Sequence, residues 1–296
     1  MVAVKPSHWL VLGALTVMWG SSYMLIALAL DGFSPLQIAG GRLLLGAVTM
    51  LFFVKRLRLP TDVTRWCYFL AIAVIGFCIP FSLIAWGQQK VDSGLASILV
   101  AMTPLWVVVF AHFMLPEGRI GARQLGGFLL GFIGVVVLIG PDSLSAIGGD
   151  SAHLLSQLGV LIAGLSYGLS SVLTAKMPET DPMVTTTVVL FLSSVLMLPF
   201  GLYSAPGWES INSLAFVALL VLGVMGTALT SVLYFWLVNG AGPRFASLFN
   251  YLIPLWAVSL GVLVLNEALT VSLLLALLLI LGGVVLTQKG GETAGQ

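Results

Sequence analysis

The sequence ASILVAMTPLWVVVFAHFMLPE, from Ala96 to Glu117, recurs later in the chain as ASLFNYLIPLWAVSLGVLVLNE, from Ala246 to Glu267. The two copies align without a gap, each matched pair being 150 residues apart. A proline, a tryptophan and a glutamate rarely fall twice in the same register by chance. The echo therefore predicts two related halves, a pattern that governs how the rest of the chain is interpreted. The matched positions are Ala96, Ser97, Pro104, Leu105, Trp106, Val108 and Glu117 with Ala246, Ser247, Pro254, Leu255, Trp256, Val258 and Glu267.

The composition is that of an integral membrane protein. Of 296 residues, 59% are hydrophobic and only 8% are charged, and the mean hydropathy is +1.11. An apolar helix of about 20 residues crosses a hydrocarbon core of about 30 Å. Ten apolar runs of this length are predicted, at about residues 9–30, 35–54, 66–86, 93–114, 122–140, 154–175, 183–203, 212–236, 244–265 and 270–288.

The echo divides these ten spans into two halves of five, residues 1–145 and 146–296. Because five is odd, the second half crosses the membrane in the opposite sense, so the repeat is inverted. Inverted repeats build many secondary transporters, with the solute site between the halves. We therefore predict an all-α membrane protein of ten transmembrane helices in two inverted five-helix repeats.

The few basic residues predict the orientation of the chain. With the N-terminus in the cytoplasm, alternate loops place ten Lys and Arg residues inside and only Lys90 outside. We expect both termini to be cytoplasmic, in a bacterial-type inner (plasma) membrane. A removable signal peptide is disfavoured, since the first run is too long and nine spans follow it. A net charge of +1 and a pI near 7.8 indicate no nucleic-acid partner.

Motifs for catalysis or metal binding are missing or out of context. Gly164–Gly168 satisfies G-x-S-x-G, but it lies inside a predicted span, and the histidines lie near span ends without a base at mid-depth. There is no P-loop, HExxH or Cys/His cluster. Cys67 and Cys78 lie too far apart on one predicted helix for a disulfide. We expect no enzyme, cofactor or metal; a channel is harder to exclude, although no filter-like loop or charged ring is visible.

Polar and aromatic residues recur at mid-depth in spans 1, 3, 4, 6, 8 and 9. In span 8, residues 227, 230, 231 and 234 carry Thr, Thr, Ser and Tyr on one helical face. Such faces favour the wall of a polar cavity, whereas packing through small residues and hydrogen bonds of Ser and Thr to their own helix are the alternative. In the second copy of the echo, Asn250 and Tyr251 replace Val100 and Ala101. A buried amide needs a partner, either a freed carbonyl or a ligand.

Three prolines predict kinks or flexible points. Pro80 lies in mid-span 3, and Pro104 and Pro254 occupy equivalent places in spans 4 and 9. A proline removes a backbone hydrogen bond, and the freed carbonyl must then face protein or water. Kinked helices at corresponding places in two halves point to a central site.

Arg42 is the one basic residue that lies away from the ends of a predicted span. A charge held centrally costs about 2.5–3.5 kcal/mol on insertion scales. Because Arg42 lies nearer the outer end of its span, the sequence favours a structural role, by snorkelling or by bonding neighbouring helix ends, over contact with a solute. Its role stays open at this point.

The echoing segments resemble the EamA repeat of the drug/metabolite transporter superfamily. PLWVVVFAHFMLPEGRIGARQLGGFLLGFIGVVVLIG and PLWAVSLGVLVLNEALTVSLLLALLLILGGVVLTQ carry the resemblance, together with TVMWGSSYMLIALAL in span 1. It covers nearly the whole chain. It implies ten helices in two inverted repeats, with a central cavity lined mainly by helices 1, 3, 4, 6, 8 and 9. Bacterial members of similar sequence include metabolite exporters, among them aromatic amino-acid exporters of YddG type.

Together these features predict a secondary carrier that exports small metabolites, above all amino acids with aromatic or apolar side chains, by alternating access. Aromatic walls suit apolar side chains, and hydroxyl and amide groups suit a zwitterion. No Asp or Glu lies at predicted mid-depth, so facilitated transport is simpler than proton exchange. The predicted lining is Trp19, Tyr23, Phe77, Phe81, Met102, Trp106, Tyr167, Ser170, Thr230, Tyr234, Asn250 and Tyr251.

Alternatives stay open. The alternative hypotheses are a structural or regulatory membrane subunit, and a carrier of drugs, sugars or nucleosides. The expected partners are a small-molecule solute and the lipid bilayer. Glycine-rich faces on spans 5 and 10 leave a homo-oligomer open, although small residues also serve packing within one chain.

Overall fold

The computed structural model describes residues 5–54, 59–115, 120–145, 151–204 and 212–291. Over these ranges every regular element is helical and there is no strand. Eight spans are long and apolar enough to cross a membrane, and two shorter apolar helices complete the set. The all-α, ten-helix prediction is confirmed. Glu117 and residues 146–150, which follow the predicted boundary between the halves, lie outside the described residues.

The first half contributes five spans. Spans 3 and 4 are each built from more than one helical segment. The elements are α1 (Pro6–Ala29), α2 (Pro35–Phe53), α3 (Val63–Ala73) with η1 (Val74–Cys78) and α4 (Ile79–Gly87), α5 (Ser93–Val100) with α6 (Thr103–Met114), and α7 (Ala122–Ser145).

The second half repeats this plan. Again the third and fourth spans, which are spans 8 and 9 of the chain, are composite. The elements are α8 (Ala152–Lys176), α9 (Pro182–Tyr203), α10 (Ser213–Gly223) with η3 (Val224–Leu229) and α11 (Thr230–Ala241), α12 (Pro243–Ala246) with α13 (Phe249–Val264), and α14 (Val271–Gly291).

Local sequence sets several helix starts. Ser34 caps α2: its hydroxyl accepts a hydrogen bond from the backbone N–H of Gln37, and the Gln37 side chain accepts one from Ser34 in return. Asp62 and Asn212 cap α3 and α10 with their side-chain oxygens. These caps place polar residues at the ends of apolar spans and so fix where each span begins.

Spans 3 and 8 contain π-helical segments at equivalent places. They are η1 and η3, which begin at Val74 and Val224. Pro80 lies just after η1, but the corresponding place after η3 holds Thr230. A proline is therefore not required for the irregularity. A π-turn holds one more residue than an α-turn, and such turns occur frequently at functional sites.

Spans 4 and 9 are interrupted. Span 4 breaks at residues 101–102, and Pro104 follows at the start of α6. Span 9 breaks at residues 247–248, whereas Pro254 lies inside the continuous helix α13. Both breaks precede the echo's conserved proline.

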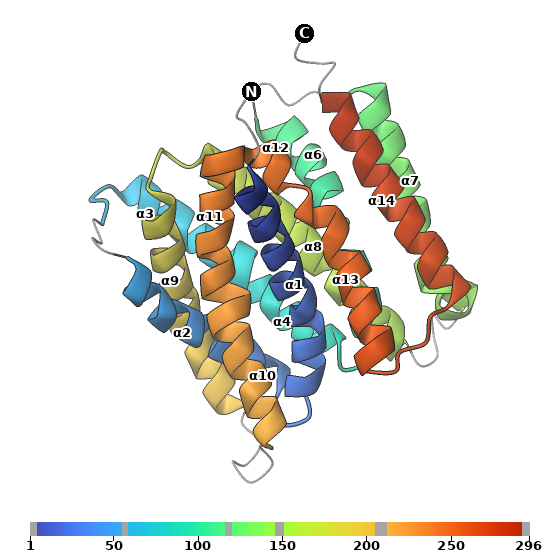
Figure 1. Cartoon of the computed structure of the whole chain (residues 1–296), viewed down its shortest axis with the longest axis horizontal. Helices are drawn as coiled ribbons and strands as arrows, with labels where there is room; N and C mark the ends of the chain where they lie inside the picture. The colour runs from blue at the N-terminus through green and yellow to red at the C-terminus, as the bar shows by residue number, and fades with distance from the viewer. Residues whose placement is uncertain (1–4, 55–58, 116–119, 146–150, 205–211, 292–296) are drawn as a thin grey trace.

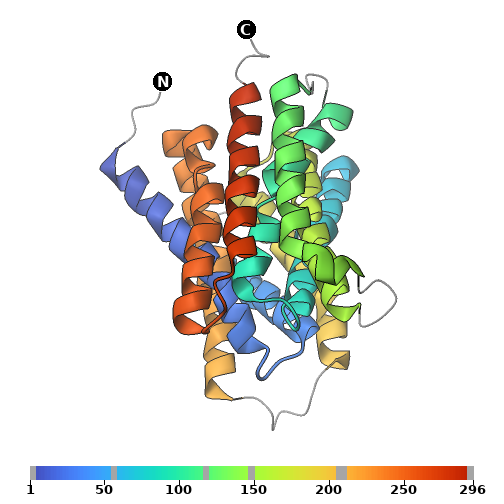
Figure 2. The ribbon, with the colours of Figure 1, turned by 90° about the vertical axis from the view of Figure 1, so that its right-hand side faces the viewer.

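The bundle has two ends (Figures 1 and 2). We call the end where α1 begins and α14 finishes the terminal end, and the other the distal end. At one side α7 and α14 run alongside each other. Gly127 of α7 approaches the backbone of Gly283 so closely that a β-carbon would collide with it. The glycines of these two helices thus serve packing within the chain.

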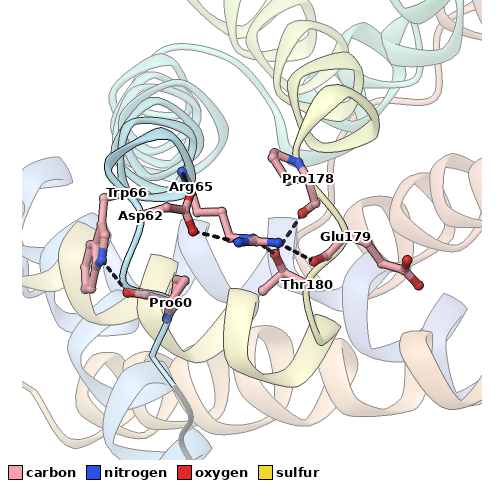
Figure 3. Close-up of polar contacts among 7 residues, drawn as sticks. All are labelled: Pro60, Asp62, Arg65, Trp66, Pro178, Glu179 and Thr180. Atoms are coloured by element: carbon pink, nitrogen blue, oxygen red, sulfur yellow. Dashed lines mark hydrogen bonds and ion pairs between the residues drawn. The ribbon is translucent and has the colours of Figure 1, made fainter.

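A polar contact joins the two halves at the terminal end (Figure 3). Arg65, in the first turn of α3, donates from Nε to the hydroxyl of Thr180 at 3.2 Å and from Nη2 to the carbonyl of Glu179 at 3.2 Å. Its Nη1 lies 2.6 Å from the carboxylate of Asp62. Because Thr180 and Glu179 precede α9, Arg65 connects span 3 with the link between spans 6 and 7.

Candidate solute-binding site

Arg42 lies inside the protein, about 10 Å along α2 from its distal start. The side chain is only 6% exposed, so it does not snorkel to the membrane surface, which was one of the two structural roles that the sequence favoured. Its Nε donates to the hydroxyl of Thr227 in η3 at 3.3 Å, and its guanidinium carbon lies 3.9 Å from the ring centroid of Phe81 in α4. The charge is held by a hydroxyl from one half and an aromatic face from the other.

Two tyrosines and a second phenylalanine complete the surroundings of Arg42. Tyr23 of α1 and Tyr167 of α8 lie within electrostatic reach of its guanidinium. Phe77 meets Phe81 edge to face, with ring centroids 5.6 Å apart. We call Tyr23, Arg42, Phe81, Tyr167 and Thr227 the Arg42 cluster. It combines one cation and three hydroxyls with an aromatic wall, at the place where the two halves meet.

Among the described residues, Arg42 has no carboxylate partner. The ion pair that the described residues do form, between Asp62 and Arg65, lies at the start of α3. An unpaired cation in a low-dielectric interior is costly. Guanidinium presents a fork of N–H donors that matches a carboxylate. The cluster is therefore suited to an anionic group from outside the protein. In this conformation it is shut off from solvent, since Tyr23, Arg42 and Phe81 are each at most 8% exposed.

A second aromatic group lies on the neighbouring spans. Trp19 of α1 contacts Phe249 of α13 at 4.8 Å and Tyr234 of α11 at 5.8 Å between ring centroids. Tyr234 and Phe249 meet at 5.8 Å. Of the predicted lining, Trp19 and Tyr234 thus lie together, whereas Tyr23, Phe77, Phe81 and Tyr167 gather at Arg42.

Several other predicted lining residues are satisfied by the chain itself. The hydroxyl of Thr230 donates to the carbonyl of Thr227 at 3.2 Å, and Thr230 is fully buried. The amide of Asn250 donates to the carbonyl of Ser247 at 3.1 Å, at the break in span 9. Tyr251 packs half-buried against the core. Thr230 thus bonds a carbonyl of its own span, and Asn250 bonds a carbonyl at the break in span 9.

The remaining predicted residues lie along spans 4 and 6. Met102 is fully buried at the break in span 4. Trp106 stands edge to face with Phe128 of α7, at 5.5 Å between centroids, and its indole N–H is buried without a partner among the described residues. Ser170 of α8 packs against Gly76 of η1.

Close glycine contacts repeat in the two halves. Gly76 of η1 packs against Ser170 of α8, and Gly226 of η3 packs against Ser22 of α1. In the same way, Gly168 lies against Trp106, and Gly20 lies against Trp256. These last contacts, too, leave no room for a β-carbon. The π-helices therefore form mirrored contacts across the junction of the halves.

Sequence reasoning did not identify the π-helices or the role of Thr227 as a partner of Arg42. The sequence did carry a usable signal for the π-helices, because spans 3 and 8 share four residue types in one register. The pairs are Val74 with Val224, Gly76 with Gly226, Leu83 with Leu233 and Trp86 with Trp236. The second carried no signal, since Arg42 and Thr227 are 185 residues apart.

Two cavities open on the surface of the bundle. One, of about 390 Å³, lies at the distal end and is lined by Gln88, Asp92 and Glu267 among others. The other, of about 310 Å³, lies between α1 and α13 beside Trp256. None of the twelve residues predicted to line a central cavity borders either one.

Comparison with known proteins gives a consistent result. The model of the EamA-like transporter family matches residues 7–140 and again 154–288. The uncharacterized transporter YoaV of Bacillus subtilis is 27% identical over 92% of this chain and 93% of its own. The uncharacterized inner membrane transporter YedA of Escherichia coli K12 is 27% identical over 94% and 89%.

Two further likenesses are more limited. A probable amino-acid metabolite efflux pump of Escherichia coli K12 is 30% identical over 62% of this chain and 59% of its own. A solved crystal structure matches with a TM-score of 0.66, at 18% identity, over 98% of this chain and 99% of that one. At that identity the structural likeness supports the fold alone.

Proposed function

The chain belongs to the EamA-like transporter family, and from that premise we propose that it is a secondary carrier that exports amino acids with apolar or aromatic side chains. Membrane transport follows from the family. The amino-acid substrate and the outward direction are the proposal. The name of the relative described as a probable amino-acid metabolite efflux pump supports this choice of solute.

The observation that carries the proposal is the buried, unpaired guanidinium of Arg42. A solute carboxylate would supply the missing counter-charge through two parallel N–H···O bonds. The hydroxyls of Tyr23 and Tyr167, which lie within electrostatic reach, are suited to the remaining polar atoms of a zwitterion. Phe77 and Phe81 offer an aromatic wall for an apolar side chain. Amino acids of this kind fit these groups better than phosphorylated sugars, which call for several cations.

Alternating access requires a contact that closes each end of the bundle in turn. At the terminal end Arg65 bonds Thr180 and the carbonyl of Glu179, joining the first half to the second. At the distal end the carboxylate of Glu267 accepts hydrogen bonds from backbone N–H groups of Ser93 and Gly94, joining the second half to the first. We infer that the halves rock about the Arg42 cluster as these contacts break and form.

The proposed location is the plasma membrane of a bacterial-type cell, with both termini in the cytoplasm. The excess of Lys and Arg in alternate loops supports this orientation. The name of the relative described as an inner membrane transporter supports the location. In this orientation the distal end faces outward.

A homo-oligomer stays a prediction, which native mass spectrometry of the detergent-solubilised protein checks.

Transport of tritiated L-phenylalanine into proteoliposomes, with and without a pH gradient, tests the function. We expect saturable uptake in both conditions, as for a facilitative carrier. Arg42→Gln should reduce uptake at least tenfold, whereas Arg123→Gln, the same change at an exposed residue, should leave it unchanged. Unlabelled 3-phenylpropionate, which keeps the carboxylate, should compete. Uptake that survives in Arg42→Gln would overturn the role of Arg42, and no uptake of any amino acid would overturn the choice of solute.

A further inference from the structure

The distal end holds a polar pocket that the proposed central site does not use. Its volume is about 390 Å³, enough for an amino acid and several waters. It lies between the end of α1, the turn from α4 to α5, and the turn that follows α13. We call it the distal pocket; its lining residues are Ala27, Gln88, Gln89, Lys90, Val91, Asp92, Ser93 and Glu267.

One carboxylate in the distal pocket is already engaged. Glu267 accepts hydrogen bonds from the backbone N–H groups of Ser93 at 2.7 Å and Gly94 at 3.0 Å. These groups begin α5, where unpaired N–H donors and the helix dipole favour an anion. Glu267 thus performs the capping role that Asp92, the residue at the N-cap position, does not perform.

The second carboxylate, that of Asp92, does not cap the helix. The side chain of Asp92 makes no cap hydrogen bond to α5, and it has no ion pair within the described part of the chain. Partial burial and the nearby charge of Glu267 raise its pKa, while His153 of α8 opposes this shift. A positive group placed in the pocket would relieve the repulsion between the two carboxylates.

Two residues that line this pocket carry buried polar atoms without partners among the described residues. Both the Nε2 and Oε1 atoms of Gln88 are buried and unpaired among the described residues, as is the hydroxyl of Ser93. Gln88 is 8% exposed and Ser93 is 1% exposed. Leaving such a group unsatisfied costs about 1–3 kcal/mol. Both residues line the pocket, so a polar molecule bound there is one way to satisfy these atoms.

We propose that the distal pocket is a second binding site for the exported amino acid, in which Asp92, Gln88 and Ser93 hold the ammonium group. The Asp92 carboxylate supplies the charge, and Gln88 Oε1 and the Ser93 hydroxyl supply further acceptors. The exposed Lys90, two residues before Asp92, faces the solute's carboxylate. The opposite charges of Asp92 and Lys90 thus match those of one zwitterion.

The two sites recognise opposite ends of the same molecule. Arg42 selects the carboxylate, whereas the distal pocket selects the ammonium. The identity of the solute as an amino acid rests on the proposed function, but the ammonium chemistry of the pocket does not. In the proposed orientation the pocket lies outside the membrane, where a released solute would pause before diffusing away.

Equilibrium dialysis of the purified full-length protein against radiolabelled phenethylamine tests the pocket by itself. This amine lacks the carboxylate that Arg42 requires. We expect saturable binding in the wild type and equal affinity in Arg42→Gln. We expect at least tenfold weaker binding in Asp92→Asn and in Gln88→Leu, the latter being similar in shape but without the amide. Asp62→Asn makes the same change at the start of α3, outside the pocket, and should bind like the wild type.

Each outcome bears on the proposal. No phenethylamine binding to the wild type, or unchanged binding in both Asp92→Asn and Gln88→Leu, would show that the pocket holds water only. Loss of binding in Arg42→Gln would place the amine at the central site, which would also overturn the distal-pocket proposal. Phenethylamine binding that depends on Asp92, together with L-phenylalanine uptake indifferent to Arg42, would leave the pocket standing while the central-site proposal fails.

Discussion

Gly76 lies against the side chain of Ser170, so that a β-carbon at residue 76 would overlap the serine hydroxyl. Gly76→Ala forces the π-helical segment of span 3 away from α8. Such overpacking costs about 1–3 kcal/mol, which lowers the melting temperature by several degrees in a protein of this size. Thermal unfolding in detergent measures the change.

The same contact supplies its own controls. The double variant Gly76→Ala with Ser170→Gly returns the space and should recover most of the loss. Gly13→Ala, in α1, meets no atom within 4 Å and should not destabilise the protein. A double variant no more stable than Gly76→Ala alone would show that the glycine is needed for another reason.

Glu267→Gln should weaken the distal contact between the halves. The carboxylate accepts two backbone N–H bonds, one on each oxygen. The neutral amide keeps one oxygen, which accepts one of these bonds, whereas its NH₂ group cannot accept the other. A hydrogen bond to a charged group contributes about 1.5–3 kcal/mol, and we expect a loss of that size in chemical denaturation. Glu179→Gln is the matched control, because the exposed carboxylate of Glu179 points away from the Arg65 contact in Figure 3. Equal stability of the two variants would contradict the capping role.

Asp92 and Asp62 should respond to pH in opposite ways. Burial first, and then Glu267, raise the pKa of Asp92, so its ionisation costs stability as pH rises through that pKa. Asp92→Asn should therefore raise the melting temperature at pH 7, and the gain should vanish in acid. Hydrogen bonds from Arg65 lower the pKa of Asp62, so its stabilisation is present at neutral pH and lost as pH falls. Melting temperatures of Asp92→Asn and Asp62→Asn, measured from pH 7 into acid, check that the two effects on stability have opposite directions.

Arg65→Lys should loosen the terminal end with little effect on global stability. The ion pair with Asp62 is partly exposed, and such pairs contribute up to about 1 kcal/mol. Lysine cannot reproduce the fork that also bonds Thr180 and Glu179. Hydrogen exchange should therefore increase at residues 178–183 while the melting temperature changes little. Unchanged exchange there would show that Arg65 does not hold this link; Arg123→Lys, at an exposed residue, is the control.

The number and order of the spans could be predicted because each apolar run must match the thickness of the bilayer. The predicted span limits agree with the helices to within a few residues for most spans, since polar caps such as Ser34 and Asp62 mark their ends. The echo also indicated that spans 4 and 9 are alike. It did not locate the break in span 9, which precedes Pro254 by several residues.

The candidate site was predicted less completely. The aromatic residues around Arg42 were selected from polarity at mid-depth, which sequence can report. The burial of Arg42 could not be predicted from residue type, because it depends on Thr227 and Phe81 from distant spans. The same holds for Thr230, which bonds a carbonyl of its own span, and for Asn250, which bonds a carbonyl at the break in span 9. Residue type predicts the need for a partner, but only the fold determines which partner is reached.

The π-helical turns in spans 3 and 8 carry information about the history of the chain. Each accommodates one residue beyond regular α-helical spacing, and the two begin at matching places, Val74 and Val224. Two independent insertions at one register are a less economical explanation than a single one. A single insertion in an ancestral five-helix polypeptide, followed by gene duplication and fusion, accounts for both turns with one event. The π-helical turn then outlasts the differences around it, since residue 80 is Pro in one copy and its counterpart 230 is Thr in the other.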